Sequence, residues 1–245
     1  MRTPPPTPPR GPTPPGGPRG PTPPPRGPTP PSRGPAPLRP VVKVSVPRPK
    51  SRSPAWLARA RRLILKPRQE WAAIAAEFTT PGPIYSRYLV PVAAIGPAAA
   101  TVGTIISGGE LSGLAGTYTI SMTDAITRGV LEYALNLLAV YLFAVVIDVL
   151  GGILGGQRNQ VQALKVAAYG STPYWLGGVT AVLPKLAPIG LLLGLYSLRL
   201  FAVGLPPVMK APSDKTLPYT LLVGAAGAMI VLVISTVLLL VIHPS

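Results

Sequence analysis

The chain has no cysteine, a single histidine and few acidic residues. Without cysteine it can form neither a disulfide bond nor a thiolate metal site. The one histidine, His243, stands near the C-terminus, which excludes catalysis or metal binding by several histidines. The serines also lack a neighbouring base. We therefore expect no catalytic residue set, no cofactor and no bound metal ion.

The acidic residues are also unevenly placed. Residues 1–68 carry fifteen Arg or Lys and no Asp or Glu, whereas the rest has eight basic and seven acidic residues. A sequence pI near 10.8 is typical of nucleic-acid-binding domains. However, no aromatic residue on which a base could stack precedes Trp56. We therefore expect no nucleic-acid partner, and instead contact of the basic segment with anionic lipid headgroups at the cytoplasmic surface.

Residues 1–53 form a basic tail rich in proline, arginine and glycine. The sequence Arg-Gly-Pro-Thr-Pro-Pro at Arg10 recurs at Arg19 and Arg26. Proline fixes φ and removes the amide donor, which predicts a disordered tail with local polyproline II structure. Two roles stay open for it: a ligand for a cytoplasmic protein that binds PxxP segments, and a spacer.

Residues 54–79 are predicted to form two short amphipathic helices separated by Pro67; we call this segment the collar. In the second helix Trp71, Ile74 and Phe78 recur at helical spacing. The first alternates apolar residues with Arg59, Arg61, Arg62 and Lys66. Both are too charged to span a membrane and are typical of helices lying among the headgroups. The alternative is a soluble hairpin packed on the cytoplasmic loops.

Residues 80–245 are predicted to be a membrane domain, because about 20 largely apolar residues suffice to cross a bilayer. Such stretches occur at about 88–107, 130–154, 166–183, 187–205 and 219–242. The predicted fold class is therefore an all-α membrane protein, a five-transmembrane-helix bundle with a disordered Pro-rich N-terminal tail.

Charge in the loops predicts how the bundle lies in the membrane. With the tail in the cytoplasm, the inside loops carry Arg158, Lys165, Lys210 and Lys215, and the outside loops Arg128 and Lys185. Basic residues prefer the cytoplasmic side. We expect a cytoplasmic N-terminus and an external C-terminus. The preference for arginine over lysine and the richness in Ala, Gly and Pro suggest a GC-rich genome, hence a bacterial plasma membrane.

Two charged residues within the spans are candidate functional residues. Asp148 and Arg199 both lie towards the inner ends of predicted spans, at a similar depth that permits an ion pair. Charges in spans are costly and often functional, so the pair is either a gate on an ion or solute path or a structural feature of the inner interface. Pro91, Pro97 and Pro173 are expected to kink their spans, since proline interrupts helical hydrogen bonding.

Small residues recur four apart in the last two spans. Gly190 and Gly194 have this spacing, as do Gly224 and Ala228. It lets helices approach closely, either within the bundle or between copies in a homo-oligomer.

Several short phrases occur in a characteristic order, most of them at span ends. They are Leu65-Lys66-Pro67-Arg68-Gln69-Glu70-Trp71 with Ile74 and Glu77, Arg87-Tyr88-Leu89-Val90-Pro91, Ala168-Tyr169-Gly170-Ser171-Thr172-Pro173, Leu183-Pro184, Tyr196-Ser197-Leu198-Arg199-Leu200, Gly204-Leu205, and Lys215 with Tyr219-Thr220. From Leu63 to Ile242 the chain resembles the Yip1 domain family in its bacterial form. The resemblance implies five spans and a cytoplasmic N-terminus. Eukaryotic relatives interact with Rab-type GTPases, but their Asp-Leu-Tyr-Gly-Pro motif is missing here, so GTPase binding is not expected.

These observations predict a non-enzymatic integral membrane protein. Its role would be that of an adaptor or membrane organiser whose tail recruits a cytoplasmic partner. The alternative is a small transporter or channel using Asp148 and Arg199, with Thr172 and Asn136 as further polar groups. An intramembrane protease is disfavoured, because Glu132 and Asp148 are about 24 Å apart on one helix at 1.5 Å per residue.

Overall fold

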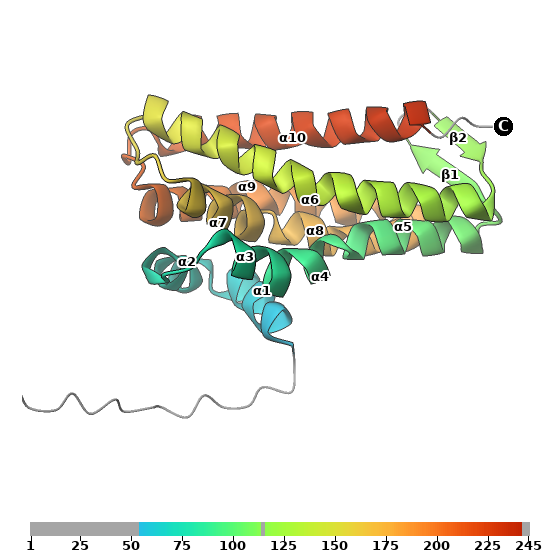
Figure 1. Ribbon diagram of the computed structural model, residues 1–245, viewed down its shortest axis with the longest axis horizontal. Coiled ribbons are helices and arrows are strands. Elements are labelled where there is room, and N and C mark those ends of the chain that lie inside the picture. The colour runs from blue at the N-terminus through green and yellow to red at the C-terminus, as the bar shows by residue number, and fades with distance from the viewer. Residues whose placement is uncertain (1–53, 114–115, 242–245) are drawn as a thin grey trace, which may run out of the picture. The chain divides into compact units, whose positions relative to one another are not determined.

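The computed structural model describes residues 54–113 and 116–241 (Figure 1). Residues 1–53, which are predicted to be disordered, lie outside the described residues, as does His243. Within them the chain is helical apart from one hairpin. The elements are α1 (Ala55–Leu65), α2 (Pro67–Ala76), α3 (Pro81–Ile84), the π-helix η1 (Tyr85–Leu89), α4 (Val90–Ala93), α5 (Ile95–Ile106), β1 (Glu110–Gly113), β2 (Gly116–Thr119), α6 (Met122–Ile153), α7 (Gln160–Gly170), α8 (Thr172–Gly177), the 3-10 helices η2 (Gly178–Val182) and η3 (Pro184–Leu186), α9 (Ala187–Met209) and α10 (Thr216–Val241).

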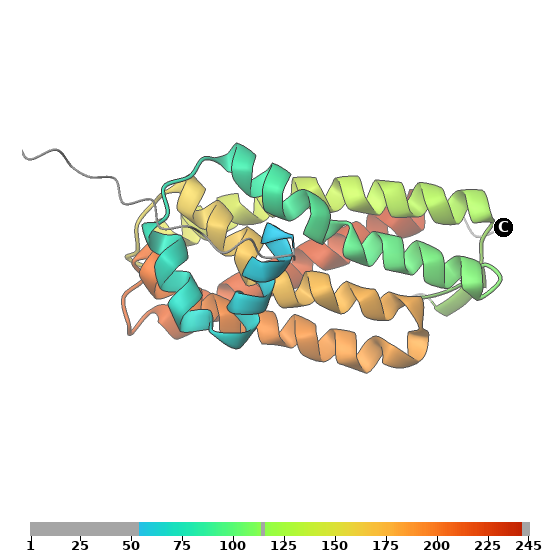
Figure 2. The ribbon, with the colours of Figure 1, turned by 90° about the horizontal axis from the view of Figure 1, so that it is seen from below.

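Four helical stretches in this part of the chain are long and apolar enough to cross a membrane. They are Pro81–Ile106, Met122–Ile153, Ala187–Met209 and Thr216–Val241. They coincide with four of the predicted spans, and most extend beyond the apolar stretch at one end. A helix needs no apolar surroundings to continue, because its backbone hydrogen bonds are internal. Figures 1 and 2 show the long helices lying side by side.

The remaining predicted span, residues 166–183, is not one continuous helix. Helix α7 ends at Gly170, and α8 begins at Thr172 with Pro173 in its first turn. A 3-10 helix, η2, then completes the segment. Because proline lacks the amide hydrogen that would continue the α7 hydrogen bonds, the helix breaks at Ser171. The predicted count of five spanning helices is therefore not confirmed.

The broken segment nevertheless runs the length of the bundle. At its start, the Gln157 amide donates to the Met209 carbonyl, 2.8 Å away, at the end of α9. At its far end, η2 packs on α5, so closely that a Cβ at Gly103 would lie 2.6 Å from the Ala181 carbonyl oxygen. We call the first end of the bundle the collar end and the other, which carries the hairpin, the hairpin end (Figure 1).

The hairpin of β1 and β2 is not among the predicted elements. Its strands are antiparallel, with Glu110 opposite Thr119. Gly109 introduces it with φ 94°, a conformation that glycine adopts without a steric penalty. Helix α6 follows directly, since the Ser121 side chain caps its first turn by accepting from the Asp124 amide.

The helix is irregular near each predicted proline kink. Pro91 follows the π-helix η1, and the helix is interrupted at Ala94, three residues before Pro97. Pro173 follows the break at Ser171. Prolines and π-bulges are the usual causes of sharp bends in helices. The kinks themselves stay a prediction.

The collar is held to the bundle by its apolar stripe. Trp71 and Ile74 of α2 are fully buried, as is Leu63 of α1. The Trp71 indole lies so close to Gly204 of α9 that a Cβ there would be 2.6 Å from Cε2 of the ring. Much of the stripe predicted to face the headgroups therefore packs on the bundle, at α9.

We predict that Gly204→Ala detaches the collar, because the added methyl group overlaps the Trp71 ring. The cost of overpacking is about 1–3 kcal/mol. Faster trypsin cleavage after Arg68 in vesicles would report it. Gly194→Ala is the matched control on the same helix, since its Cβ would meet no atom closer than 4.0 Å. Equal cleavage rates in the two variants would contradict the contact.

Candidate functional site

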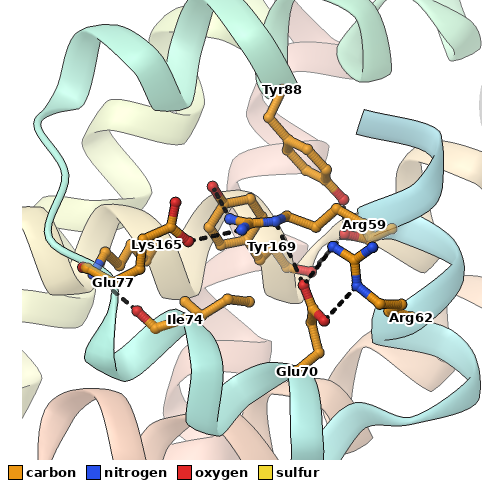
Figure 3. Close-up of polar contacts among 9 residues, drawn as sticks. Arg59, Arg62, Glu70, Ile74, Glu77, Tyr88, Lys165 and Tyr169 are labelled. Carbon is orange, nitrogen blue, oxygen red and sulfur yellow. Dashed lines mark hydrogen bonds and ion pairs between the residues drawn. The ribbon is translucent and has the colours of Figure 1, made fainter. Parts of the chain in front are cut away.

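A network of charged and hydroxyl groups joins the collar to the bundle. We call it the collar cluster (Figure 3). Its members come from α1, α2, η1, α7 and α8: Arg59, Arg62, Glu70, Glu77, Tyr88, Lys165, Tyr169 and Thr172.

Glu70 links the two collar helices. Its carboxylate is nearly buried and accepts from Nε of Arg62 at 2.7 Å and from Nη2 at 3.1 Å. Two parallel bonds of this kind fix both position and orientation. Nε of Arg59 is a further 3.5 Å neighbour of the same carboxylate. One acidic side chain thus holds two arginines of α1.

Arg59 lies at the centre of the cluster, between Glu70 and Glu77 (Figure 3). Its Nη2 donates to Glu77 at 2.7 Å, and its Nη1 donates to the Tyr169 hydroxyl at 3.0 Å. The guanidinium carbon is also 5.1 Å from the centre of the Tyr169 ring. Because a guanidinium has five donors in a rigid fork, one residue can join α1, the end of α2 and α7.

Lys165 of α7 secures the end of α2. Its Nζ is buried and donates to the carbonyls of Ile74, at 2.9 Å, and Glu77, at 2.6 Å. The last carbonyls of a helix lack internal partners and attract cations. Burial lowers the pKa of Lys165; the positive Arg59 acts in the same direction, while the negative Glu77 opposes both. The dipoles of the Ile74 and Glu77 carbonyls stabilise the Lys165 ammonium group.

The helix break at Ser171 is closed by hydroxyl groups. Thr172 Oγ1 donates to the Tyr169 carbonyl at 2.6 Å. It also lies 2.6 Å from the Tyr88 hydroxyl. Since the single threonine hydrogen is already used, the Tyr88 hydroxyl must donate in that second bond. The Tyr88 and Tyr169 rings meet edge-on with centres 4.7 Å apart. The Tyr169 carbonyl at the break therefore accepts a hydrogen bond from a side-chain hydroxyl.

The contacts of the collar cluster position helices against one another. Its basic groups are paired with carboxylates, a hydroxyl or carbonyls, and neither cysteine nor histidine takes part. Across residues 54–113 and 116–241 no three Asp, Glu, His or Cys side chains come together as metal ligands.

The structure does not bring Asp148 and Arg199 together. Asp148 of α6 pairs with Arg158, 3.5 Å away in the turn after that helix. The guanidinium of Arg199 instead lies 5.6 Å from the centre of the Tyr196 ring on its own helix. The nearby turn supplies Asp148 with a closer cation. The predicted pair is thus replaced by a contact at the collar end.

Residues 61–235 match the Yip1 domain family. The chain belongs to that family. No curated protein and no solved structure matches the chain. Most of the collar cluster lies inside the Yip1 domain; Arg59 precedes the matched region by two residues.

Three of the phrases that carried the resemblance to Yip1 proteins meet in space at the cluster. Glu70, Glu77, Tyr88, Tyr169 and Thr172 belong to three separate phrases of the sequence, and all five take part in the network. Sequence reasoning did not assign them as a site.

A signal for this site was nevertheless present. Glu70 and Glu77 are the first two acidic residues of the chain, after fifteen basic ones, and stand seven residues apart on one helix face.

We predict that Lys165→Met lowers the free energy of unfolding by about 1–3 kcal/mol, because the carbonyls of Ile74 and Glu77 lose a charged donor. Thermal unfolding in detergent, with trypsin cleavage after Arg68, measures the loss. Lys185→Met removes an exposed lysine near the hairpin end and serves as control. A Lys165→Met protein as stable as the control would show that the bonds to α2 contribute nothing.

Proposed function

We propose that this Yip1 domain protein is a non-enzymatic adaptor or membrane organiser. Its collar would bind anionic headgroups, and its N-terminal tail would recruit a cytoplasmic partner. The observation that carries the proposal is the collar cluster, which fixes a basic helix to one end of an apolar bundle.

The charge at the collar end supports headgroup binding. Arg59 and Arg62 are engaged with carboxylates, but further basic side chains at this end are exposed: Arg61, Lys66, Arg68, Arg158, Lys210 and Lys215. At the hairpin end the exposed charged side chains include Glu110 and Asp124 as well as Lys185. Each basic residue near an anionic surface contributes about 1 kcal/mol to binding.

Exposed apolar side chains of the collar support insertion among the headgroups. Phe78, just after α2, is 98% exposed, and Leu65, at the end of α1, is 64% exposed. They stand beside exposed Lys66 and Arg68, the combination typical of interfacial helices. One side of the collar thus packs on the bundle, and another remains available to lipid.

We further propose five crossings of a bacterial plasma membrane, with a cytoplasmic N-terminus and an external C-terminus. In support, α7, α8 and η2 together extend from the collar end to the hairpin end, although the helix is broken. A broken helix is tolerated at membrane depth where protein buries its free backbone groups. Tyr88 and Thr172 meet that requirement.

The orientation predicts the compartment of a reporter fused after Ser245. An odd number of crossings places the two ends on opposite sides, so a fused alkaline phosphatase should be active and a fused green fluorescent protein dark in bacterial cells. The same reporters fused before Met1 serve as the control, with the opposite result. A fluorescent C-terminal fusion would contradict five crossings.

The adaptor role is tested by crosslinking in membranes followed by mass spectrometry. We expect the full chain to capture a defined cytoplasmic protein that a chain lacking residues 1–53 does not capture. Both chains keep the collar, so lipid contacts at Arg61 and Arg68 should be equal. An identical profile for the two chains would reduce the tail to a spacer and contradict recruitment.

The alternative function, a transporter or channel using Asp148 and Arg199, makes a different prediction for the same preparation. Vesicles containing the full chain would then show solute or ion flux that Asp148→Asn abolishes. The pairing of Asp148 with Arg158 in an exposed turn favours a structural role for this carboxylate.

A further inference from the structure

A cavity of about 540 Å³ lies between α6, α8, α9 and α10. This volume falls in the range of about 300–1,000 Å³ found for small-molecule sites. The walls are almost entirely apolar and include Phe143, Leu198 and Phe201. Leu191 and Leu195 of α9 and Leu221 of α10 also line it but are more than half exposed. The mouth of the cavity therefore opens between α9 and α10, on the apolar flank of the bundle.

A buried polar group in the wall has no hydrogen-bond partner. Trp175 is 6% exposed, and its Nε1 donates to no acceptor among the described residues. Asn136, which is 5% exposed, lines the same wall and can donate from its side-chain amide. An unsatisfied buried donor typically costs about 1–3 kcal/mol. An occupant with a hydrogen-bond acceptor at this point would remove that cost.

A second cavity, of about 190 Å³, shares three lining residues with the first. Asn136, Tyr174 and Trp175 line both cavities. The second cavity is bordered by small residues such as Gly96 and Gly178, and by Glu132. Glu132 pairs with Arg128 near the start of α6, towards the hairpin end. Trp175 and Asn136 therefore stand at the junction between the apolar chamber and a cavity that borders a charged group.

We propose that these cavities bind one ester-linked acyl chain of a membrane glycerolipid. The hydrocarbon chain occupies the larger cavity, and its ester carbonyl accepts hydrogen bonds from Trp175 and Asn136. The glycerol end points through the smaller cavity towards Arg128 and Glu132. This site is separate from the collar, and the proposal does not depend on the adaptor role.

The geometry favours an acyl chain over other occupants. A mouth between two membrane-crossing helices is reached from the bilayer, where lipid chains are by far the most abundant apolar molecules. A helix of a second copy would bring its own satisfied backbone and no free carbonyl for the two donors. Water needs two to four polar partners at its site. Beyond the junction, the side chains that line the chamber are apolar except for the hydroxyls of Ser171 and Ser197.

Photocrosslinking of lipid to the full chain in nanodiscs tests the proposal. The probe is a trace of phosphatidylglycerol with a diazirine halfway along one ester-linked acyl chain. The comparison probe carries the same chain on an ether bond, which lacks the carbonyl. We expect adducts on cavity residues such as Phe143 and Leu198, with the ester probe exceeding the ether probe by about threefold or more, as one hydrogen bond predicts.

Variants separate the chamber from the donors. Gly194→Leu fills open space in the larger cavity and should reduce cavity adducts of both probes about tenfold, the effect of 1.4 kcal/mol. Trp175→Phe and Asn136→Leu should instead remove the preference for the ester probe. Thr236→Leu adds bulk on an exposed part of α10 outside the cavity and should change neither result.

Three outcomes would overturn the proposal. One is adducts spread over the exposed faces of the helices and unchanged by Gly194→Leu, which would mean bulk lipid only. Another is equal labelling by ester and ether probes in the unmodified protein, which would mean that no carbonyl is recognised. The third is an absence of cavity adducts. Gel filtration and thermal unfolding of each variant establish that it is folded before its labelling is compared.

Discussion

Close approach of helices at glycine holds this bundle together. Apolar helices gain little from the hydrophobic effect when lipid surrounds them, so contact between backbones and specific hydrogen bonds must supply the stability. Gly204 admits the Trp71 ring, and Gly103 admits the backbone of η2. The Tyr219 hydroxyl adds a hydrogen bond of 2.6 Å to the Ile147 carbonyl. The collar and the broken segment can pack on the bundle because these positions carry no side chain.

The break at Ser171 connects the two sites. Its N-terminal side, α7, brings Lys165 and Tyr169 to the collar, whereas its C-terminal side, α8, places Trp175 in the cavity wall. A continuous helix would have placed these residues at other angles around its axis. Pro173 leaves the Tyr169 carbonyl without its helical donor. The Thr172 hydroxyl donates to this carbonyl, which lowers the energetic cost of the break in apolar surroundings.

Sequence patterns predicted much of the fold. Long apolar stretches predicted four helices close to their observed positions. Pro67 predicted that the collar divides into two helices. The phrases around Glu70, Tyr88 and Tyr169 indicated the Yip1 domain family, which the match over residues 61–235 confirms. The hairpin escaped prediction because its strands are four residues each and carry no apolar periodicity.

The sequence by itself determined that this is an apolar helical protein with a basic N-terminal region, because solvent preference and helical periodicity are local properties of the chain. Only the tertiary structure decided which side chains contact one another. Asp148 meets Arg158 rather than Arg199, Trp71 faces a glycine rather than lipid, and Lys165 caps a helix that lies 91 residues before it in the chain. Such pairings depend on how helices rotate about their axes and where they break, which packing fixes and local sequence does not.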